Sequence, residues 1–369
     1  MIIRNIRGVV MVRQAARGAL VLVLVAVMLE STGRGQPSLN PDRIYYRDKK
    51  DRDGAPKSVE GEIKATPAGY QILASGNKVI PISPIDIVRV LPAELPGIEQ
   101  KDLIAVGLPE NAKDWEKARL GYEELKKQTK NTAEKTRKFL DFKLATLTAK
   151  AADATAEDAG WKEKTEGAAT LLSQYLSDYK GGWEVYPAGR TCARLQTELG
   201  QFENASRTWA KLVNNSDVPP DLRQEAHFQE VDSLIRAHRY PDASARATEA
   251  LKSAAAGGPK DRLAICQIAA KYADTNPVDG VAPIEAEIAK SKDPVTRAVG
   301  YEMIAELYLV AKKPREAMWA LLWVEVVYNQ DRDEVVKSMA RLAESFQLQG
   351  DEERAKATRD KLRRYRATL

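Results

Sequence analysis

The strongest constraint on the fold is an internal repeat in the C-terminal half of the chain. Four helix-start strings, GQFENASRTW, HRYPDASARATEAL, KKPREAMWAL and GDEERAKATRD, align on Ala205, Ala243, Ala317 and Ala355. The first two alanines and the last two are each 38 residues apart, and the middle pair is 74 apart, which leaves room for one divergent unit at about 260–291. A period of about 34 to 40 residues with two helices per unit is typical of a helical solenoid.

Large and small apolar residues recur at fixed places within the best-matched units, at the spacings of a helix pair. They are Tyr301, Ile304, Ala305, Tyr308, Ala317, Leu321 and Val324 in one unit, and Met339, Leu342, Ala343, Phe346, Gly350, Ala355 and Leu362 in the next. With these spacings the units resemble tetratricopeptide repeats over about 185–369, and more loosely over 111–184. The resemblance implies a mainly α protein, with a solenoid of antiparallel helix pairs over 111–369. Small residues would lie where helices cross closely, and large ones would fill the grooves.

Residues 41–95 have the texture of a small β-module. Short segments rich in Ile, Val and Tyr alternate with turn sequences such as TPAG and SGN, and in VEGEIKA small or apolar residues alternate with charged ones, as in a strand with one buried face. Five short strands with short loops predict a meander that closes into a small SH3-like or Sm-like barrel. The expected strands are 43–47, 59–65, 69–74, 78–82 and 86–91.

The N-terminus has the pattern of an export signal. Four arginines precede GALVLVLVAVML, an uninterrupted apolar run at 18–29 that Glu30 ends. A transmembrane helix needs about 20 apolar residues, and a secretory signal about 7 to 15. We therefore expect export to the periplasm or cell envelope with cleavage within 27–37. An uncleaved anchor in 1–37 is the alternative and the one expected route to a membrane.

The net charge of the chain and its lack of known motifs argue against several classes of function. The net charge is +5, and residues 1–30 supply three of these charges, so the body lacks the dense basic surface that nucleic-acid binding needs. We find no nucleotide-binding, catalytic or zinc motif and predict no cofactor, no metal and no catalytic residue. His227 and His238 are 11 residues apart, which on one face of a helix would separate them by about 16 Å, too far to share a metal ion. Cys192 and Cys266 occupy equivalent places two units apart, which predicts buried free thiols.

One string stands out as a candidate interface. AMWALLWVEVVY, residues 317–328, is apolar on nearly every helical face, so it is either enclosed by neighbouring helices or covered by a partner. Aromatic side chains are favoured anchors in interfaces. The predicted function is an exported, non-enzymatic scaffold that holds a protein or peptide in a helical groove, with Tyr301, Tyr308, Trp319 and Trp323 as candidate partner-binding residues. The alternative is an envelope hydrolase or lyase on an α/α-hairpin scaffold, with acid and base residues that the sequence does not identify.

Overall fold

The computed structural model describes residues 41–48, 55–66, 69–129, 133–155 and 160–367. Residues 42–369 cluster as one unit. The predicted export signal or anchor at 1–37 lies outside the described residues. Within the described part, no helix is both long enough and apolar enough to cross a membrane.

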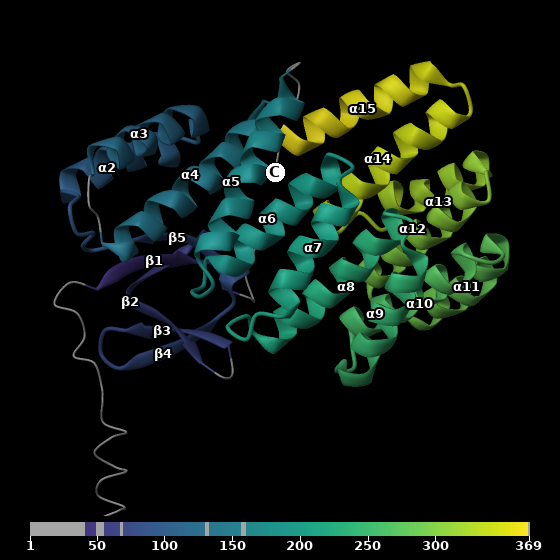
Figure 1. Ribbon diagram of the computed structural model, residues 1–369, viewed down its shortest axis with the longest axis horizontal. Helices are drawn as coiled ribbons and strands as arrows, with labels where there is room; N and C mark the ends of the chain where they lie inside the picture. The colour runs from purple at the N-terminus through teal and green to yellow at the C-terminus, as the bar shows by residue number, and fades with distance from the viewer. Residues whose placement is uncertain (1–40, 49–54, 67–68, 130–132, 156–159, 368–369) are drawn as a thin grey trace, which may run out of the picture. The chain divides into compact units, whose positions relative to one another are not determined.

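The β-module is an open antiparallel sheet (Figure 1). All five predicted strands are present, as β1 Asp42–Tyr46, β2 Lys57–Thr66, β3 Gly69–Ala74, β4 Lys78–Ile82 and β5 Ile87–Leu91. Their order is β4-β3-β2-β1-β5, so the first four form the predicted meander and β5 returns to pair with β1.

The predicted closed barrel is wrong, because β4 and β5 are the two edges of the sheet and do not pair. The sheet packs against the helical domain instead of against itself. Ile44, Tyr70 and Ile72 form the buried face, and Trp183 from the loop between α5 and α6 packs on it. The Tyr70 hydroxyl lies 3.0 Å from the carbonyl oxygens of both Gly182 and Asp217. Loops between helices α5 and α6 and between α7 and α8 thus contact the apolar face that a barrel would have enclosed.

Fourteen α-helices and two short 3-10 helices make up the rest of the described chain. They are α2 Gln100–Asn111, α3 Trp115–Gln128, α4 Glu134–Ala154, α5 Trp161–Asp178, α6 Val185–Glu198, α7 Phe202–Val213, α8 Pro220–Arg236, α9 Tyr240–Ser253, α10 Gly258–Ala273, α11 Val281–Lys290, α12 Pro294–Val310, α13 Pro314–Val326, α14 Arg332–Leu348 and α15 Glu352–Ala367, with η1 Pro84–Asp86 and η2 Pro277–Gly280. Consecutive helices pack as antiparallel pairs (Figure 1), which confirms the predicted α-solenoid architecture. The divergent unit at about 260–291 is α10 with the short α11.

The helix pairs share one type of junction, which explains the repeat. Ala205, Ala243, Ala317 and Ala355 are all completely buried. Five residues before each alanine the chain adopts a left-handed conformation, and the residues there are Gly200, His238, Lys312 and Gly350. At each of these four junctions, the backbone N–H groups of this residue and of the next one donate to carbonyl oxygens in the last turn of the preceding helix. Gly200 donates to Thr197, and Gln201 donates to Gln196. These bonds form a Schellman motif, so every junction turns the chain in the same way.

The array curls until its last helix pair meets its first helices. Helix α14 packs against α6 and α12, and α15 packs against α4. Arg190 of α6 lies 2.6 Å from Asp333 of α14, and Arg366 of α15 lies 2.9 Å from Glu198 of α6. The Arg366 guanidinium also lies 4.5 Å from the ring centroid of Trp161, at the start of α5. The inner side of the solenoid is therefore occupied by part of the solenoid itself.

Candidate functional site

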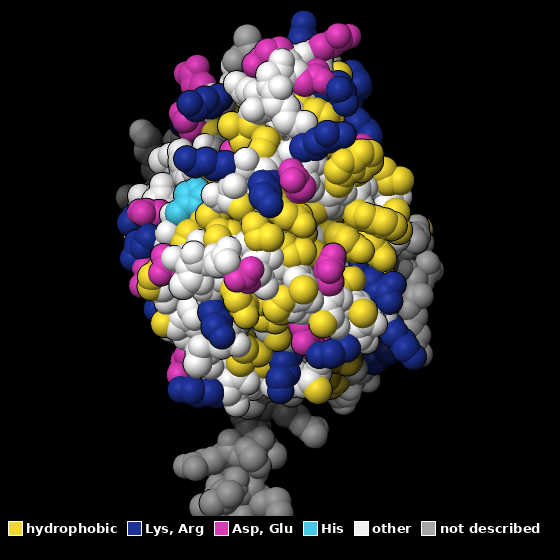
Figure 2. Space-filling model, turned by 90° about the vertical axis from the view of Figure 1, so that its right-hand side faces the viewer, with side chains coloured by type: hydrophobic (Ala, Val, Ile, Leu, Met, Phe, Trp, Pro, Cys, Tyr) yellow, Lys and Arg dark blue, Asp and Glu magenta, His cyan; other side chains and the backbone are white. Residues whose placement is uncertain are grey.

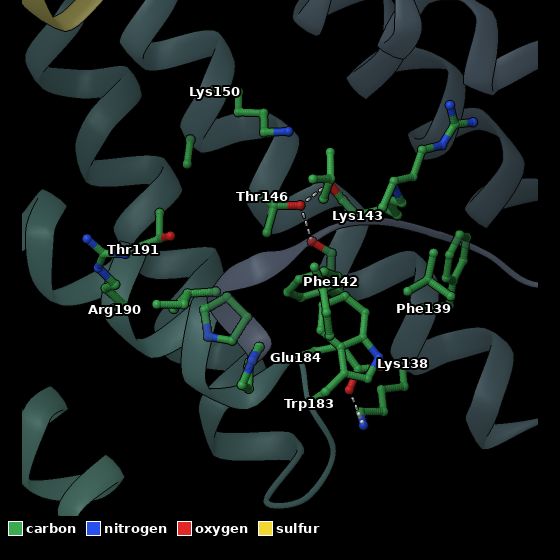
Figure 3. A pocket seen from close by; sticks show the side chains of 18 of the residues that line it. Lys138, Phe139, Phe142, Lys143, Thr146, Lys150, Trp183, Glu184, Arg190 and Thr191 are labelled. Atoms are coloured by element: carbon green, nitrogen blue, oxygen red, sulfur yellow. Dashed lines mark hydrogen bonds and ion pairs between the residues drawn. The ribbon is translucent and has the colours of Figure 1, made fainter. Parts of the chain in front are cut away.

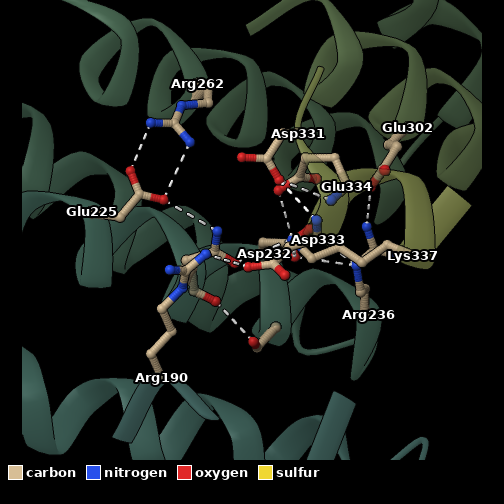
Figure 4. A network of polar contacts seen from close by, with 12 residues as sticks. Arg190, Glu225, Asp232, Arg236, Arg262, Glu302, Asp331, Asp333, Glu334 and Lys337 are labelled. Carbon is tan, nitrogen blue, oxygen red and sulfur yellow. Dashed lines mark hydrogen bonds and ion pairs between the residues drawn. The ribbon is translucent and has the colours of Figure 1, made fainter. Parts of the chain in front are cut away.

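A buried network of ion pairs fills the centre of the helix stack (Figure 4). Lys337 of α14 lies 3.1 Å from Asp232 of α8 and 3.0 Å from Glu334 of its own helix. Arg236 of α8 contacts Asp232 at 3.1 Å and also pairs with Glu302 of α12. These contacts join three helix pairs through side chains that are almost fully buried. The concave face that we expected to hold a peptide is thus largely used for internal contacts, and a cavity of about 570 Å³ remains beside it.

The network holds more carboxyl groups than cations. Asp232, Glu302 and Glu334 face Arg236 and Lys337. Burial would raise the pKa of Asp232, but Arg236 and Lys337 outweigh it and lower that pKa. Burial and the neighbouring Glu334 raise the pKa of Glu302 well above its usual value. Three acids thus face two bases, and the cost of burying a further negative charge is the physical reason for the raised pKa of Glu302.

The histidines and cysteines occupy structural positions. His238 is the left-handed junction residue before α9, and its Nδ1 lies 2.6 Å from the hydroxyl of Tyr240. His227 is half-buried on α8. Cys192 and Cys266 are buried free thiols, as predicted, and burial raises the pKa of both.

The four predicted partner-binding residues lie on two adjacent helices. Tyr301 and Tyr308 are seven residues apart on α12, and Trp319 and Trp323 are four apart on α13, so each pair lies on one face of its helix. The rings of Tyr301 and Trp323 stack with centroids 5.5 Å apart and planes at 15°. Because α12 and α13 run antiparallel, Trp319 lies at a level between Tyr301 and Tyr308. The structure therefore brings the predicted residues to one region.

The sequence prediction left out one member of this group. Tyr328 follows the end of α13, and its ring stacks on Tyr301 at 5.6 Å and 16°. Tyr328 ends the apolar string 317–328, but it lies beyond the end of α13, so helical spacing could not predict that its ring stacks on Tyr301. Together with two exposed valines, these side chains form what we call the aromatic surface, which consists of Tyr301, Tyr308, Trp319, Trp323, Val326, Val327 and Tyr328.

The aromatic surface is open to solvent. The exposed fraction is 59% for Trp319, 47% for Trp323 and 67% for Val326, whereas Ala317 and Leu321 on the opposite face of α13 are buried. Figure 2 shows hydrophobic side chains gathered on the side of the molecule where α11 and α13 lie, with charged side chains around them. Neighbouring helices therefore enclose one side of this string but leave both tryptophans exposed, and cover by a partner stays a prediction.

Two carboxylates border the aromatic surface. Burial, the hydroxyl of Tyr328 and Glu285 of α11 raise the pKa of Tyr301. Burial, Glu285 and Glu316 of α13 raise the pKa of Tyr308. Both glutamates are exposed, and within the described part of the chain neither has an ion-pair partner. The surface thus offers aromatic faces next to two unpaired negative charges and one cation, Arg297 of α12, whose guanidinium lies 5.9 Å from the ring centroid of Tyr328. Glu285 lies in the divergent unit, where the repeat pattern gives no guide to its position.

No family model and no curated protein matches this sequence. Among solved structures, a tetratricopeptide repeat protein from Parabacteroides merdae is similar to this chain, with 16% sequence identity and a TM-score of 0.45. The match covers 72% of this chain and 98% of that protein.

Proposed function

We propose that the protein is a non-enzymatic scaffold that binds a segment of a protein partner on the aromatic surface. The observation that carries the proposal is the exposed Trp319 and Trp323 beside the stacked rings of Tyr301 and Tyr328. Aromatic residues in a connected, exposed patch are typical anchors of protein interfaces. Trp319, Trp323, Val326 and Val327 are all exposed, so the patch is an apolar site that a partner could cover.

The electrostatics favour a partner segment that combines apolar side chains with Lys or Arg. A cation there would face the ring of a tryptophan or tyrosine and could also pair with Glu285 or Glu316. An acidic segment would meet like charges at Glu285 and Glu316, which outnumber the one cation of the surface, Arg297 beside Tyr328. The site therefore fits a basic, apolar peptide stretch and discriminates against an acidic one.

Selection from a random peptide library on the purified full-length protein tests this proposal. We expect the recovered peptides to be enriched in apolar residues and in Lys or Arg, and to bind the Trp319→Ala and Trp323→Ala variants at least about 30-fold more weakly, since truncation of an aromatic anchor costs about 2 kcal/mol or more. Leu171→Ala is the matched control, because Leu171 is an exposed apolar residue of α5 far along the chain, with an exposed fraction of 44%.

Circular dichroism and melting must first show that each variant is folded. Peptides that bind folded Trp319→Ala and Trp323→Ala as tightly as the parent would remove the aromatic surface from the interface. Enrichment of acidic peptides would contradict the proposed charge of the partner. Turnover of a glycan or peptide by the purified protein, abolished by one carboxylate substitution, would favour the hydrolase or lyase alternative.

We also propose that the protein works outside the cytoplasm, in the periplasm or cell envelope. The support is the sequence pattern of four arginines followed by the apolar run at 18–29. N-terminal sequencing of protein purified from native cells should show the loss of about the first 27 to 37 residues, the span in which a signal of this length is cleaved. Protein that begins at Met1 in the soluble cytosolic fraction would contradict export.

A further inference from the structure

A second site lies at the other end of the molecule, where the sheet meets the first helices. A cavity of about 790 Å³ opens between η1 and β5 on one side and α4 and α6 on the other (Figure 3). This volume is in the usual range for small-molecule sites. Phe142 of α4 and Trp183 form an edge-to-face pair in its wall, with ring centroids 5.5 Å apart. Phe139, Ile85 and Val88 also line the cavity, and the latter two are exposed to it or to solvent.

One end of the cavity holds an excess of positive charge. Glu110 of α2 accepts hydrogen bonds from Lys143 of α4 at 2.8 and 3.1 Å. Two more cations face the same carboxylate, Arg89 of β5 and Lys150 of α4, and together the three outweigh burial and lower the pKa of Glu110. One carboxylate thus faces three cations. All four residues line the cavity.

The two extra cations have no acidic partner of their own. The Arg89 guanidinium donates to the neutral side-chain oxygen of Asn111, and its Nε is buried without a hydrogen-bond partner in the described structure. Lys150 makes no ion pair within the described residues, and its Nζ lies 4.6 Å from the ring centroid of Trp115. Burial and Arg89 lower the pKa of Lys150. A buried donor without a partner and a lysine beside other cations are both satisfied by an added anion.

Most other charges on the cavity wall are already paired, and Glu134 and Arg332 line it without an ion pair among the described residues. Lys138 lies 3.0 Å from Glu184, and Arg194 lies 2.7 Å from Asp153. Arg190 is held by Asp333. Three of these six side chains, Lys138, Glu184 and Arg190, are labelled in Figure 3 together with Lys143 and Lys150. Arg89 and Lys150 are thus cations without an ion-pair partner among the described residues, beside Lys143 and its partner Glu110, and Phe142 and Trp183 form an apolar wall of the same cavity.

We propose that this cavity binds an amphipathic organic carboxylate. The carboxylate lies among Arg89, Lys143 and Lys150, and the apolar body of the ligand packs against Phe142 and Trp183. The site draws its cations from a strand and a helix, and its acid from another helix, so it exists only in the folded chain. It is separate from the aromatic surface, which is built from α12, α13 and the residues that follow α13.

Decanoate, decanol and inorganic phosphate are the probes that separate the parts of this proposal. We expect calorimetry on the full-length protein to show binding of decanoate, at least tenfold weaker binding of decanol, which lacks the charge, and no binding of phosphate, which lacks the apolar body. Decanoate affinity should fall as salt is added. Equal affinity for decanoate and decanol would overturn the role of the cations, and the absence of decanoate binding would overturn the site.

Two variants place the ligand in the cavity by independent routes. Lys150→Met keeps the length of the side chain but removes a charge, and Val88→Glu adds a negative charge to the wall at an exposed position of β5. Each should weaken decanoate at least tenfold. Lys162→Met, on the exposed face of α5, is the matched control and should bind as the parent does. Parent-like binding by both folded cavity variants would overturn the proposal.

Discussion

The pKa of Glu302, in the interior of the protein, is set by a balance between burial and neighbouring charges of both signs. One of its carboxyl oxygens accepts from Arg236, and the other is buried without a hydrogen-bond partner in the described structure. Its pKa is raised by burial and by Glu334. Above the unfolded pKa, a carboxyl group whose folded pKa is raised binds more protons in the folded state than in the unfolded chain, so it makes stability fall as pH rises.

Glu302→Gln tests this balance. In the parent, the contribution of Glu302 is fully favourable below its unfolded pKa of about 4.3 and declines as pH rises from there towards the raised folded pKa. The variant carries a permanently neutral amide and should lose this decline. Urea unfolding between about pH 4 and pH 8 should therefore show the variant gaining stability relative to the parent as pH rises. Glu316→Gln at an exposed position of α13 is the control, and a parent-like slope for Glu302→Gln would contradict the assignment.

Among single residues, those of the aromatic surface could be predicted in part from the sequence, whereas the cations of the cavity between β5 and α4 could not. Trp319 and Trp323 stood out because an unusually apolar helix carried two of the largest side chains. Arg89 and Lys150 gave no such signal, because one lies in a strand and the other in a helix, about 60 positions apart. Only the fold, which puts β5 and α4 on the two sides of one cavity beside Glu110, brings them together.

The helix pair is the element that the sequence described best. Ala205, Ala317 and Ala355 are completely buried at the start of second helices, where a close crossing leaves no space for a larger side chain. Local spacing was enough to find them, because each pair is built from consecutive residues. Helix α2 was missed: the repeat domain was expected from 111, yet α2 begins at Gln100. Its sequence contains Gly107 and Pro109 and shows no one-sided apolar pattern.

Ala205→Leu, Ala317→Leu and Ala355→Leu should each destabilise the protein by about 1 to 3 kcal/mol, because overpacking forces neighbouring side chains or the backbone to move. Ala357→Leu is a close control, since Ala357 lies on the same helix as Ala355 but is exposed. Chemical denaturation of the four variants gives the comparison. If the three buried-site variants unfold like Ala357→Leu, the alignment of the repeat on these alanines is wrong.

The sheet shows where local pattern stops being informative. Strand positions followed from alternation and turn residues, and the observed bounds differ from the expected ones by at most two residues. Whether a sheet closes depends on what covers its apolar face. Here Trp183 and the partners of the Tyr70 hydroxyl come from segments more than 100 residues away from β3 in the chain. No feature within 41–95 could indicate that contact.

At the scale of the whole molecule, ion pairs close the solenoid. Helix α14 lies against α6 and α12, and Lys337 joins α14 to Asp232 of α8. The repeat pattern predicted the stack but not its curvature, which follows from small rotations added over successive pairs. For this reason we propose that a partner binds on the exposed side of α12 and α13 and not on the concave face, where we expected it.

Lys337→Met should destabilise the protein by about 3 kcal/mol, because it leaves Glu334 and part of the charge of Asp232 buried without their cation. Lys252→Met is the control: its partner Glu249 is exposed, and solvent screens a surface pair of this kind, so its loss should change stability little. Equilibrium unfolding in denaturant measures both. A loss for Lys337→Met no larger than that for Lys252→Met would show that the network does not hold the solenoid closed.

The central claim is that the aromatic surface carries a protein partner, and site-specific photocrosslinking in native cells tests it most directly. A photoreactive phenylalanine analogue replaces Trp319 in one variant and Val79, an equally exposed residue of β4, in another. We predict an adduct with one main protein from position 319 alone, attached to a segment that is apolar and contains Lys or Arg. The absence of an adduct at 319, or the same adducts at 319 and 79, would contradict the account.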